Sequence, residues 1–492
     1  MSYLQLFVLR QKISNFIIRV KSHEKYHFCK MYNKAFPLKW YRRFVEHKGI
    51  LSALFYVLLA AVIIIPRWCY LQKYGLSFPF WDQWDAEGED VVRPLVEGRF
   101  KFSNLWLPHN EHRVLPTRIV TLICFKLTGI WSNLNEARAN VFIAALTPVF
   151  LVWLMRVKSQ LHGLRWFVLP ILIAQFVLPF GWENVLVGFQ SQFFFLMFFA
   201  LSGFALATFK PEDIWAFGGV LILSLLSILT MASGILLPLI ACGLYIFHSI
   251  IDRRNYLLTL VFVLLLLIVA IAGYQMVSHV DGHERLRATD LRQFFEGFTR
   301  VLSWPSRINR WLAIPLWLPV FIGIPILLIR KSFTGFDLLM TACFAWTMAQ
   351  VLAISYGRGH ELAQVTSRYT DLLTLGLISV SWFSVRLLDE FQRNVRVWML
   401  MFAIGLSFYI TFYKTHKLRF IDDLIDMKNQ YALMSLEVSN VAAYYKTHDK
   451  SALDKPRFEI PYPDKERLQQ MLDLKSYQSV LPRIDKDIKT NE

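Results

Sequence analysis

Acidic and tryptophan residues gather in one short segment that directly follows the first long apolar run. Asp82, Asp85 and Glu89 are spaced i, i+3 and i+7, so a helix there would place the three carboxylates on one face. Grouped carboxylates can take the proton of an acceptor hydroxyl or bind a divalent metal ion. Trp81 and Trp84 flank them, and indole rings suit sugar binding as well as membrane anchoring. The alternative is a solvated acidic loop beside an aromatic belt.

A second polar cluster follows at residues 109–113. Glu111 is a further candidate acid or base, and the guanidinium group of Arg113 suits a phosphate. His109 and His112 are candidates for binding a sugar or an acceptor, because zinc would require one or two additional ligands. The alternative is a polar loop whose groups are satisfied by hydrogen bonds within the loop.

A third polar cluster lies between two apolar segments and consists of Trp182, Glu183 and Asn184 together with Gln190 and Gln192. Buried polar groups at the end of a membrane span need partners, so these side chains either line a cavity or bridge neighbouring helices. We expect contacts to sugar or acceptor here, and the two readings are equally supported.

A fourth cluster combines Arg358, His360 and Arg368 with Tyr369. Guanidinium groups at a membrane surface suit a lipid-linked phosphate or diphosphate, although arginine also reaches lipid headgroups without any specific ligand. We expect the first three residues to bind the phosphate of a donor and Tyr369 to contact sugar or acceptor.

Composition indicates which elements must position these clusters. The chain of 492 residues is 55% hydrophobic and only 18% charged, with a mean hydropathy of +0.39. Soluble proteins carry about 25% charged residues, and several apolar runs here reach the length of roughly 20 residues that crosses a bilayer. The sequence therefore predicts an all-α polytopic protein embedded in a lipid bilayer. The net charge of +17 is concentrated in residues 1–49, which argues for a basic cytoplasmic segment and against a nucleic-acid partner.

Hydropathy predicts about eleven transmembrane helices in a domain at residues 50–413, with a long first outer loop at 69–135. The expected spans lie near residues 50–68, 136–155, 166–180, 189–208, 215–232, 234–251, 256–277, 311–329, 336–355, 369–386 and 396–413. Lys and Arg concentrate in alternate loops, which predicts a cytoplasmic N-terminus and an extracytoplasmic tail at 414–492 with a helical stretch around 420–445. Residues 114–131 and 291–302 are expected to form helices at the membrane surface rather than spans.

The chain contains no glycine-rich nucleotide loop and no Walker pattern. A membrane enzyme of this kind must take its activated substrate from the bilayer. The basic N-terminus, the first span, the long outer loop with Asp82 and Asp85, and the bundle that follows resemble GT-C type integral-membrane glycosyltransferases over most of residues 45–415. The Trp-Glu-Asn segment and Ser367-Arg368-Tyr369 are similar to segments of bacterial envelope proteins of this type.

This resemblance implies a polyprenyl-phosphate-linked sugar as donor and a first-loop acid as catalytic base or metal ligand. Asp82 or Asp85 would take that role here. The spacing Asp82-X-X-Asp85 departs from a strict Asp-X-Asp, so Mg²⁺ or Mn²⁺ is only a candidate cofactor. We therefore expect a glycosyltransferase of the plasma (inner) membrane that glycosylates a glycan, lipid or protein of the cell envelope on the extracytoplasmic face. The alternatives are a transporter or flippase of lipid-linked saccharides, or an O-antigen-type polymerase or ligase.

Overall fold

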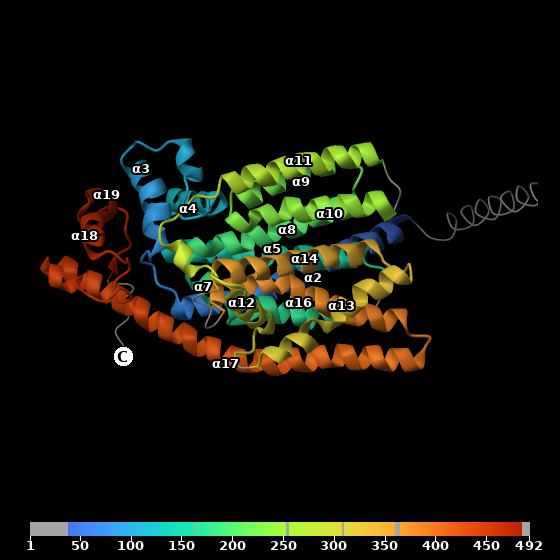
Figure 1. The fold of residues 1–492 in the computed structure, drawn as a ribbon. Helices are drawn as coiled ribbons and strands as arrows, with labels where there is room; N and C mark the ends of the chain where they lie inside the picture. Colours follow the sequence, from blue (N-terminus) through green and yellow to red (C-terminus); the bar gives the residue numbers. More distant parts are fainter. Residues whose placement is uncertain (1–37, 162, 252–254, 308, 360–364, 485–492) are drawn as a thin grey trace, which may run out of the picture. The chain divides into compact units, whose positions relative to one another are not determined.

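The structure is a computed structural model that describes residues 38–161, 163–251, 255–307, 309–359 and 365–484. Regular structure in this part of the chain is helical, apart from one isolated bridge between His109 and His112 (Figure 1). Ten of the described helices are long and apolar enough to cross a membrane. The prediction of an all-α, multi-span membrane protein is thereby confirmed. The chain divides into two compact units between Ala61 and Val62; this boundary falls within the first of the ten helices, and the remaining helices and the cavity belong to the second unit.

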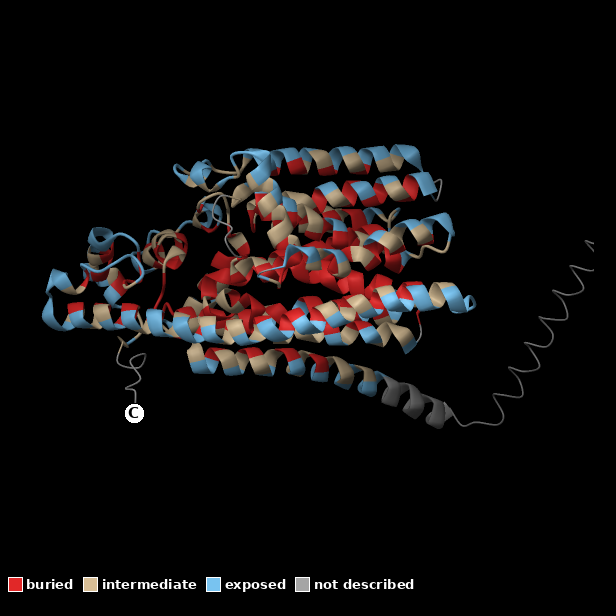
Figure 2. Cartoon of the chain, turned by 60° about the horizontal axis from the view of Figure 1, so that its bottom comes forward, coloured by how far each residue is buried: buried red, intermediate tan, exposed pale blue. Residues whose placement is uncertain are grey.

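The ten helices reproduce ten of the expected spans, with shifted ends. Their bounds are Gly49–Tyr74, which is part of α2 (Leu38–Tyr74), Asn133–Lys158 (α5), Gly163–Leu186, Gly188–Phe209 (η5 and α8), Ala232–Ile251 (η6 and α10), Tyr256–Gln275 (α11), Arg310–Ile329 (η8 and α13), Gly335–Gly357 (α14), Ser367–Glu390 (α15, η9 and α16) and Val395–Thr447 (α17). Residues buried by the protein itself lie along the inside of the bundle (Figure 2).

The third span is broken where the sequence prediction has one short helix. It consists of η3 (Gly163–Val168), α6 (Leu169–Val177), η4 (Pro179–Gly181) and α7 (Trp182–Leu186). Leu178 is extended, with ψ of 150°, because the ring of Pro179 disfavours helical backbone at the preceding residue. The break turns α7, and with it the Trp-Glu-Asn cluster, into a separate short helix.

The span expected at 215–232 is shorter than predicted. Helix α9 covers Ile214–Ile228, and its 15 residues extend about 22 Å, less than the roughly 30 Å of a hydrocarbon core. The carboxylate of Asp213 caps its first turn by accepting from two backbone amides. The chain then turns tightly at Gly234, where an added Cβ would come within 2.0 Å of the Ser227 carbonyl oxygen, so only glycine fits.

The last span continues without interruption into the tail. Helix α17 runs over 53 residues from Val395 to Thr447, whereas the prediction has a span at 396–413 and a separate helical stretch around 420–445. No proline or glycine follows Gly405 in this helix, so nothing in the sequence stops it before His448, whose φ of 54° ends it. At 1.5 Å per residue the helix is about 80 Å long, and a large part of it extends past any bilayer core.

The segment after α17 folds back onto the first loop. Helices α18 (Lys465–Asp473) and α19 (Lys475–Gln478) lie beside α3 (Arg93–Val96) in Figure 1. The two regions share one apolar core, made of Leu76, Phe78, Phe80, Trp84, Val92, Trp131, Met434, Val438, Val441, Tyr444, Leu453, Ile460, Tyr462, Leu468, Met471, Leu472, Tyr477 and Val480. The tail, for which the sequence suggested no role, is therefore part of the structure that shapes the first loop.

Three further helices lie in the connecting regions near the site. The helix expected at 114–131 is α4 (Leu115–Thr128), which at 14 residues is not among the described helices long enough to span. The amphipathic helix expected at 291–302 is α12 (Leu291–Ser303). A π-helix, η1, spans Trp84–Val92 within the first loop, and such wide turns are frequent at functional sites.

Candidate functional site

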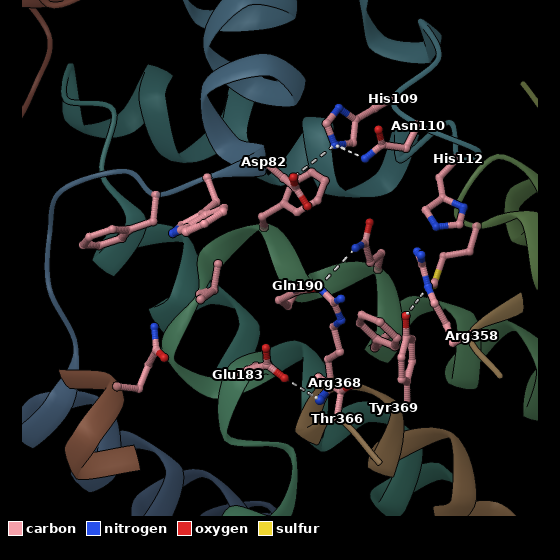
Figure 3. A pocket seen from close by; sticks show the side chains of 18 of the residues that line it. Asp82, His109, Asn110, His112, Glu183, Gln190, Arg358, Thr366, Arg368 and Tyr369 are labelled. Carbon is pink, nitrogen blue, oxygen red and sulfur yellow. Dashed lines mark hydrogen bonds and ion pairs between the residues drawn. The ribbon is translucent and has the colours of Figure 1, made fainter. Parts of the chain in front are cut away.

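A cavity of about 750 Å³ opens at one end of the bundle. It is formed by the first loop, the starts of α7, η5 and α15, the end of α14, the loop after α11, and the C-terminal part of the chain. Twelve of the residues singled out in the sequence line it: Trp81, Asp82, His109, Glu111, His112, Trp182, Glu183, Gln190, Gln192, Arg358, Arg368 and Tyr369. Asp82 and His109 lie on one side of this space, and Arg358, Arg368 and Tyr369 lie across from them (Figure 3).

Two guanidinium groups form the cationic side of the cavity. Nε of Arg358 donates to the Tyr369 hydroxyl at 3.3 Å, and the guanidinium of Arg368 lies 5.4 Å from the centre of the Tyr369 ring. Nε of Arg368 is buried and has no hydrogen-bond partner within the described residues. Because buried polar groups are normally paired, a free donor on a cation facing a cavity is suited to an anionic ligand.

The Trp-Glu-Asn cluster fixes the backbone that carries Arg368. The Glu183 carboxylate accepts from the Ser367 hydroxyl at 2.6 Å and from the Arg368 amide at 3.0 Å. The side-chain amide of Asn184 donates to the Arg368 carbonyl at 2.9 Å and to Asp371 at 2.9 Å. Asn184 is fully buried and does not line the cavity, so it positions Arg368 instead of contacting a ligand.

Asp82 is the accessible acid of the first loop. Its side chain is 49% exposed, and its nearest basic group is Nε2 of His109 at 3.9 Å. Trp81, directly before it, has a left-handed backbone with φ of 53°, which is strained for a tryptophan, and its amide donates to the Pro461 carbonyl at 2.7 Å. The tail thus holds the turn that presents Asp82 to the cavity.

The other two acids of this segment point away from the cavity, contrary to the expectation of one acidic face. Asp85 accepts from Arg467 at 2.6 Å and from the hydroxyl of Tyr462 at 3.1 Å. Glu89 accepts from Tyr477 at 2.8 Å and pairs with Arg93 at 2.9 Å. The expected face assumed the period of an α-helix, whereas the i→i+5 pairing of η1 has a wider turn that rotates Asp85 and Glu89 toward the tail.

The expected contact of Trp84 with a sugar does not fit its position. Trp84 has no exposed surface and packs in the loop–tail core, with ring centres 5.1 Å from Trp131 and 5.5 Å from Tyr477. Its indole nitrogen donates to the Pro79 carbonyl at 3.1 Å. A sequence does not distinguish an exposed aromatic ring from a buried one. Trp84 is buried because the C-terminal segment, including Tyr477, packs against it.

The 109–113 cluster is a tight turn closed by two backbone hydrogen bonds between His109 and His112, at 2.8 and 2.9 Å. Nδ1 of His112 accepts from the Ala232 amide at 3.1 Å, and Glu111 bonds to His283 at 2.6 Å. Burial lowers the pKa of both turn histidines, that of His112 to about 4. Burial would raise the pKa of Glu111, but the hydrogen bond with His283 and the nearby imidazoles outweigh it and place this pKa below the usual value.

One expected phosphate ligand, Arg113, is directed away from the cavity. Arg113 does not line it, because its guanidinium donates to the Met276 carbonyl at 2.9 Å and to the Trp106 carbonyl at 3.4 Å. His360 lies outside the described residues. A divalent metal stays a candidate from sequence alone, and within the described ranges no group of three or more His, Cys, Asp or Glu side chains could hold one.

Gln190 and Gln192, which the sequence groups with the Trp-Glu-Asn cluster, line the cavity and are bonded to each other at 3.2 Å. Other lining residues escaped sequence analysis. The largest omission is the C-terminal part of the chain, which contributes Gln430, Leu433, Met434, Glu437, Arg457 and Phe458. Single polar residues on a long amphipathic helix resemble its solvated face, so no pattern marked them.

The sequence matches no protein-family model, and it matches no curated protein. The chain is therefore described as a multi-span helical membrane protein, and the likeness to GT-C enzymes stays a prediction.

Proposed function

We propose that the protein is a membrane glycosyltransferase that moves a sugar from a polyprenyl-phosphate donor to a hydroxyl of an envelope glycan, lipid or protein. The observation that carries this proposal is the convergence of three residues from distant parts of the chain. Asp82, Arg358 and Arg368 line the same cavity, although 276 residues separate the first from the second. A carboxylate across from two guanidinium groups supplies a base for an acceptor and a binding site for a leaving phosphate.

The proposed reaction uses these groups in one displacement. The Asp82 carboxylate takes the proton of the acceptor hydroxyl while that oxygen forms a bond to the anomeric carbon. The bond from the anomeric carbon to the phosphate oxygen breaks, and the lipid phosphate leaves with the electron pair. Arg358 and Arg368 stabilise the negative charge that develops on this oxygen. Glu183 and Asn184 act on the reaction only by holding Arg368.

A flippase for lipid-linked saccharides is the competing function, since charged residues around a cavity also suit transport. Sealed vesicles containing the purified protein, a polyprenyl-phosphate sugar and an envelope acceptor separate the two. The proposal requires glycosylated acceptor and free lipid phosphate in equal amounts, and requires both to be lost in Asp82→Asn. Translocation of the donor without transfer, unchanged in Asp82→Asn, would replace the enzyme by the flippase. Transfer of a preassembled polysaccharide in place of single sugars would indicate a polymerase or ligase.

We further propose that the cavity faces the extracytoplasmic side. The short loops at the opposite end of the bundle are basic, a feature typical of cytoplasmic loops; they contain Arg156, Lys158, Arg165, Arg330, Lys331, Arg393 and Arg396. Met231 lines the cavity, so the short helix α9 runs back to the cavity end, which supports a topology with an odd number of crossings. Reporter fusions at residue 40 and after residue 484 should therefore report the cytoplasm and the exterior, respectively. Two cytoplasmic signals would contradict this topology.

A further inference from the structure

Glu437 is a buried acid that the proposed reaction does not use. It lies on the part of α17 that lines the cavity, and its side chain is only 2% exposed. Oε1 accepts one hydrogen bond, from the indole nitrogen of Trp81 at 3.3 Å. Oε2 has no partner within the described residues, and no described cation forms an ion pair with the carboxyl group. A buried carboxyl group with a free oxygen is costly unless a ligand supplies the missing donor.

The surroundings of Glu437 combine apolar rings with a polar group. Phe458 lines the cavity and is 62% exposed, although it is a large apolar residue. Its ring lies 5.3 Å from the Trp81 ring, and the exposed guanidinium of Arg457 lies 5.3 Å from the same indole. An open aromatic surface beside a carboxylate suits a sugar ring, whose C–H face packs on aromatic carbons while its hydroxyls donate to the acid.

We propose that Glu437 and Phe458 form an acceptor subsite that binds one sugar unit of a glycan chain. This inference rests on the proposed function and adds the class of acceptor, a saccharide. Glu437 holds the indole of Trp81, and Trp81 directly precedes Asp82 in the chain. A sugar bound by Glu437 is therefore placed beside the carboxylate that takes its proton. The two arginines on the other side remain available for the donor phosphate.

The subsite also assigns a role to the C-terminal segment. Its two ligand-binding residues come from α17 and from the stretch before α18, both of which are held on the first loop by the shared apolar core. The segment completes the acceptor side of the cavity, and the bundle supplies the donor side. Acceptor choice and donor choice are then encoded in different parts of the chain.

Direct binding of saccharides to the full-length purified protein tests the inference without requiring turnover. The probes are oligosaccharides released by mild acid from the envelope of the producing cells, observed by saturation-transfer difference NMR in the absence of donor. We expect Glu437→Gln to weaken binding about tenfold or more, because an NH2 group replaces the oxygen that is free to accept from a sugar hydroxyl, while the remaining amide oxygen still bonds to Trp81. Phe458→Ala truncates an exposed ring and should weaken the same binding about fivefold without unfolding the protein.

The matched control is Asp454→Asn, the same charge change at an exposed acid of the C-terminal segment that does not line the cavity. It should bind the probes like the unmodified protein, with the same thermal midpoint. Asp82→Asn should also keep saccharide binding although it loses transfer, so a failed transfer assay leaves this inference standing. Equal binding by the unmodified protein, Glu437→Gln and Phe458→Ala, or binding by none of them, would overturn the subsite. Strong transfer to a non-saccharide acceptor would also overturn it, while leaving the glycosyltransferase intact.

Discussion

The two sides of the cavity are built in different ways. The arginine side, residues 182–192, 358–359 and 366–369, consists of helix ends whose backbone is fixed by buried polar side chains such as Glu183 and Asn184. The acid side, residues 80–82, 430–437 and 457–458, is fixed by an apolar core that joins two regions more than 300 residues apart. On the arginine side, a few hydrogen bonds with defined geometry hold the residues in position. On the acid side, the residues are held only when the whole C-terminal segment is packed on the first loop.

This difference predicts how each side responds to change. Single substitutions should act sharply on the arginine side, where one lost acceptor frees the backbone of a ligand-binding residue. On the acid side, loss of the reacting carboxylate should strongly reduce transfer. The contacts that attach the tail are spread over many residues, so losing any one of them should have a small effect. The predictions below test this comparison in order of expected effect.

The largest effect is expected at Asp82. Asp82→Asn keeps the shape of the side chain and removes the base, so transfer should fall about 10²–10⁴-fold. Because the side chain is 49% exposed and makes no short hydrogen bond to any described residue, the yield and thermal midpoint of the protein should stay unchanged. Steady-state transfer with a polyprenyl-phosphate sugar gives the rate. Near-normal transfer by this variant would show that Asp82 is not the base. It would also contradict the proposed division of the cavity into an acid side and an arginine side.

The next effect is expected at Arg368. Arg368→Ala removes a cation with a free Nε from the donor side, and transfer should fall about 10²-fold. Arg368→Lys retains the charge but lacks the planar fork, so it should recover only part of the loss. Donor binding, measured with the polyprenyl-phosphate sugar alone, should weaken in both variants, while saccharide binding stays constant. A loss of saccharide binding instead would place the acceptor on the arginine side.

Glu183 tests positioning on the same side. Glu183→Ala leaves the Ser367 hydroxyl and the Arg368 amide without their acceptor, which costs about 1–3 kcal/mol of stability. Displacement of Arg368 should raise the KM for the donor about tenfold while kcat changes less. Glu183→Gln keeps one acceptor oxygen and should recover most of the donor affinity. Glu466→Ala, at an exposed acid of α18, is the control. Equal KM values for Glu183→Ala and this control would show that the clamp has no functional role.

These contrasts also explain which parts of the molecule could be predicted from sequence. Hydropathy gave the spans, because roughly 20 apolar residues in a row have few alternatives to a membrane helix. Arg358 and Arg368 could be singled out because two guanidinium groups and a histidine lie close together at the ends of two spans, where they suit a phosphate. Glu437 could not, because a single acid on a helix that leaves the membrane resembles a solvated residue. The direction of Asp85 could not be predicted either, because a π-helix has no simple sequence pattern.

The pH dependence of stability offers a smaller effect. Burial lowers the pKa of His112 to about 4, below the value of about 6.5 in an unfolded chain. The unfolded state therefore binds more protons between these values, so the stabilisation from neutral His112 is complete above pH 6.5 and is lost as the pH falls toward 4. His112→Asn retains an acceptor for the Ala232 amide without a titrating group. Between pH 7 and pH 5, its thermal midpoint should fall less than that of the unmodified protein, and identical slopes would contradict a buried neutral imidazole.

The smallest effect is expected at Asp85, the acid that sequence alone ranks next to Asp82. Its carboxylate is 34% exposed and pairs with Arg467, itself 49% exposed, and such surface pairs contribute about 0–1 kcal/mol. Asp85→Asn should therefore leave transfer within about twofold of normal and lower the thermal midpoint slightly, because the neighbouring core still attaches the tail. Parallel transfer assays of Asp82→Asn and Asp85→Asn show whether one carboxylate or both take part in the reaction. Equal losses in both would mean that the acid side acts as one carboxylate cluster, as the sequence spacing suggests. A loss confined to Asp82 would mean that the tail has taken Asp85 out of the chemistry and uses it only to hold the acid side together.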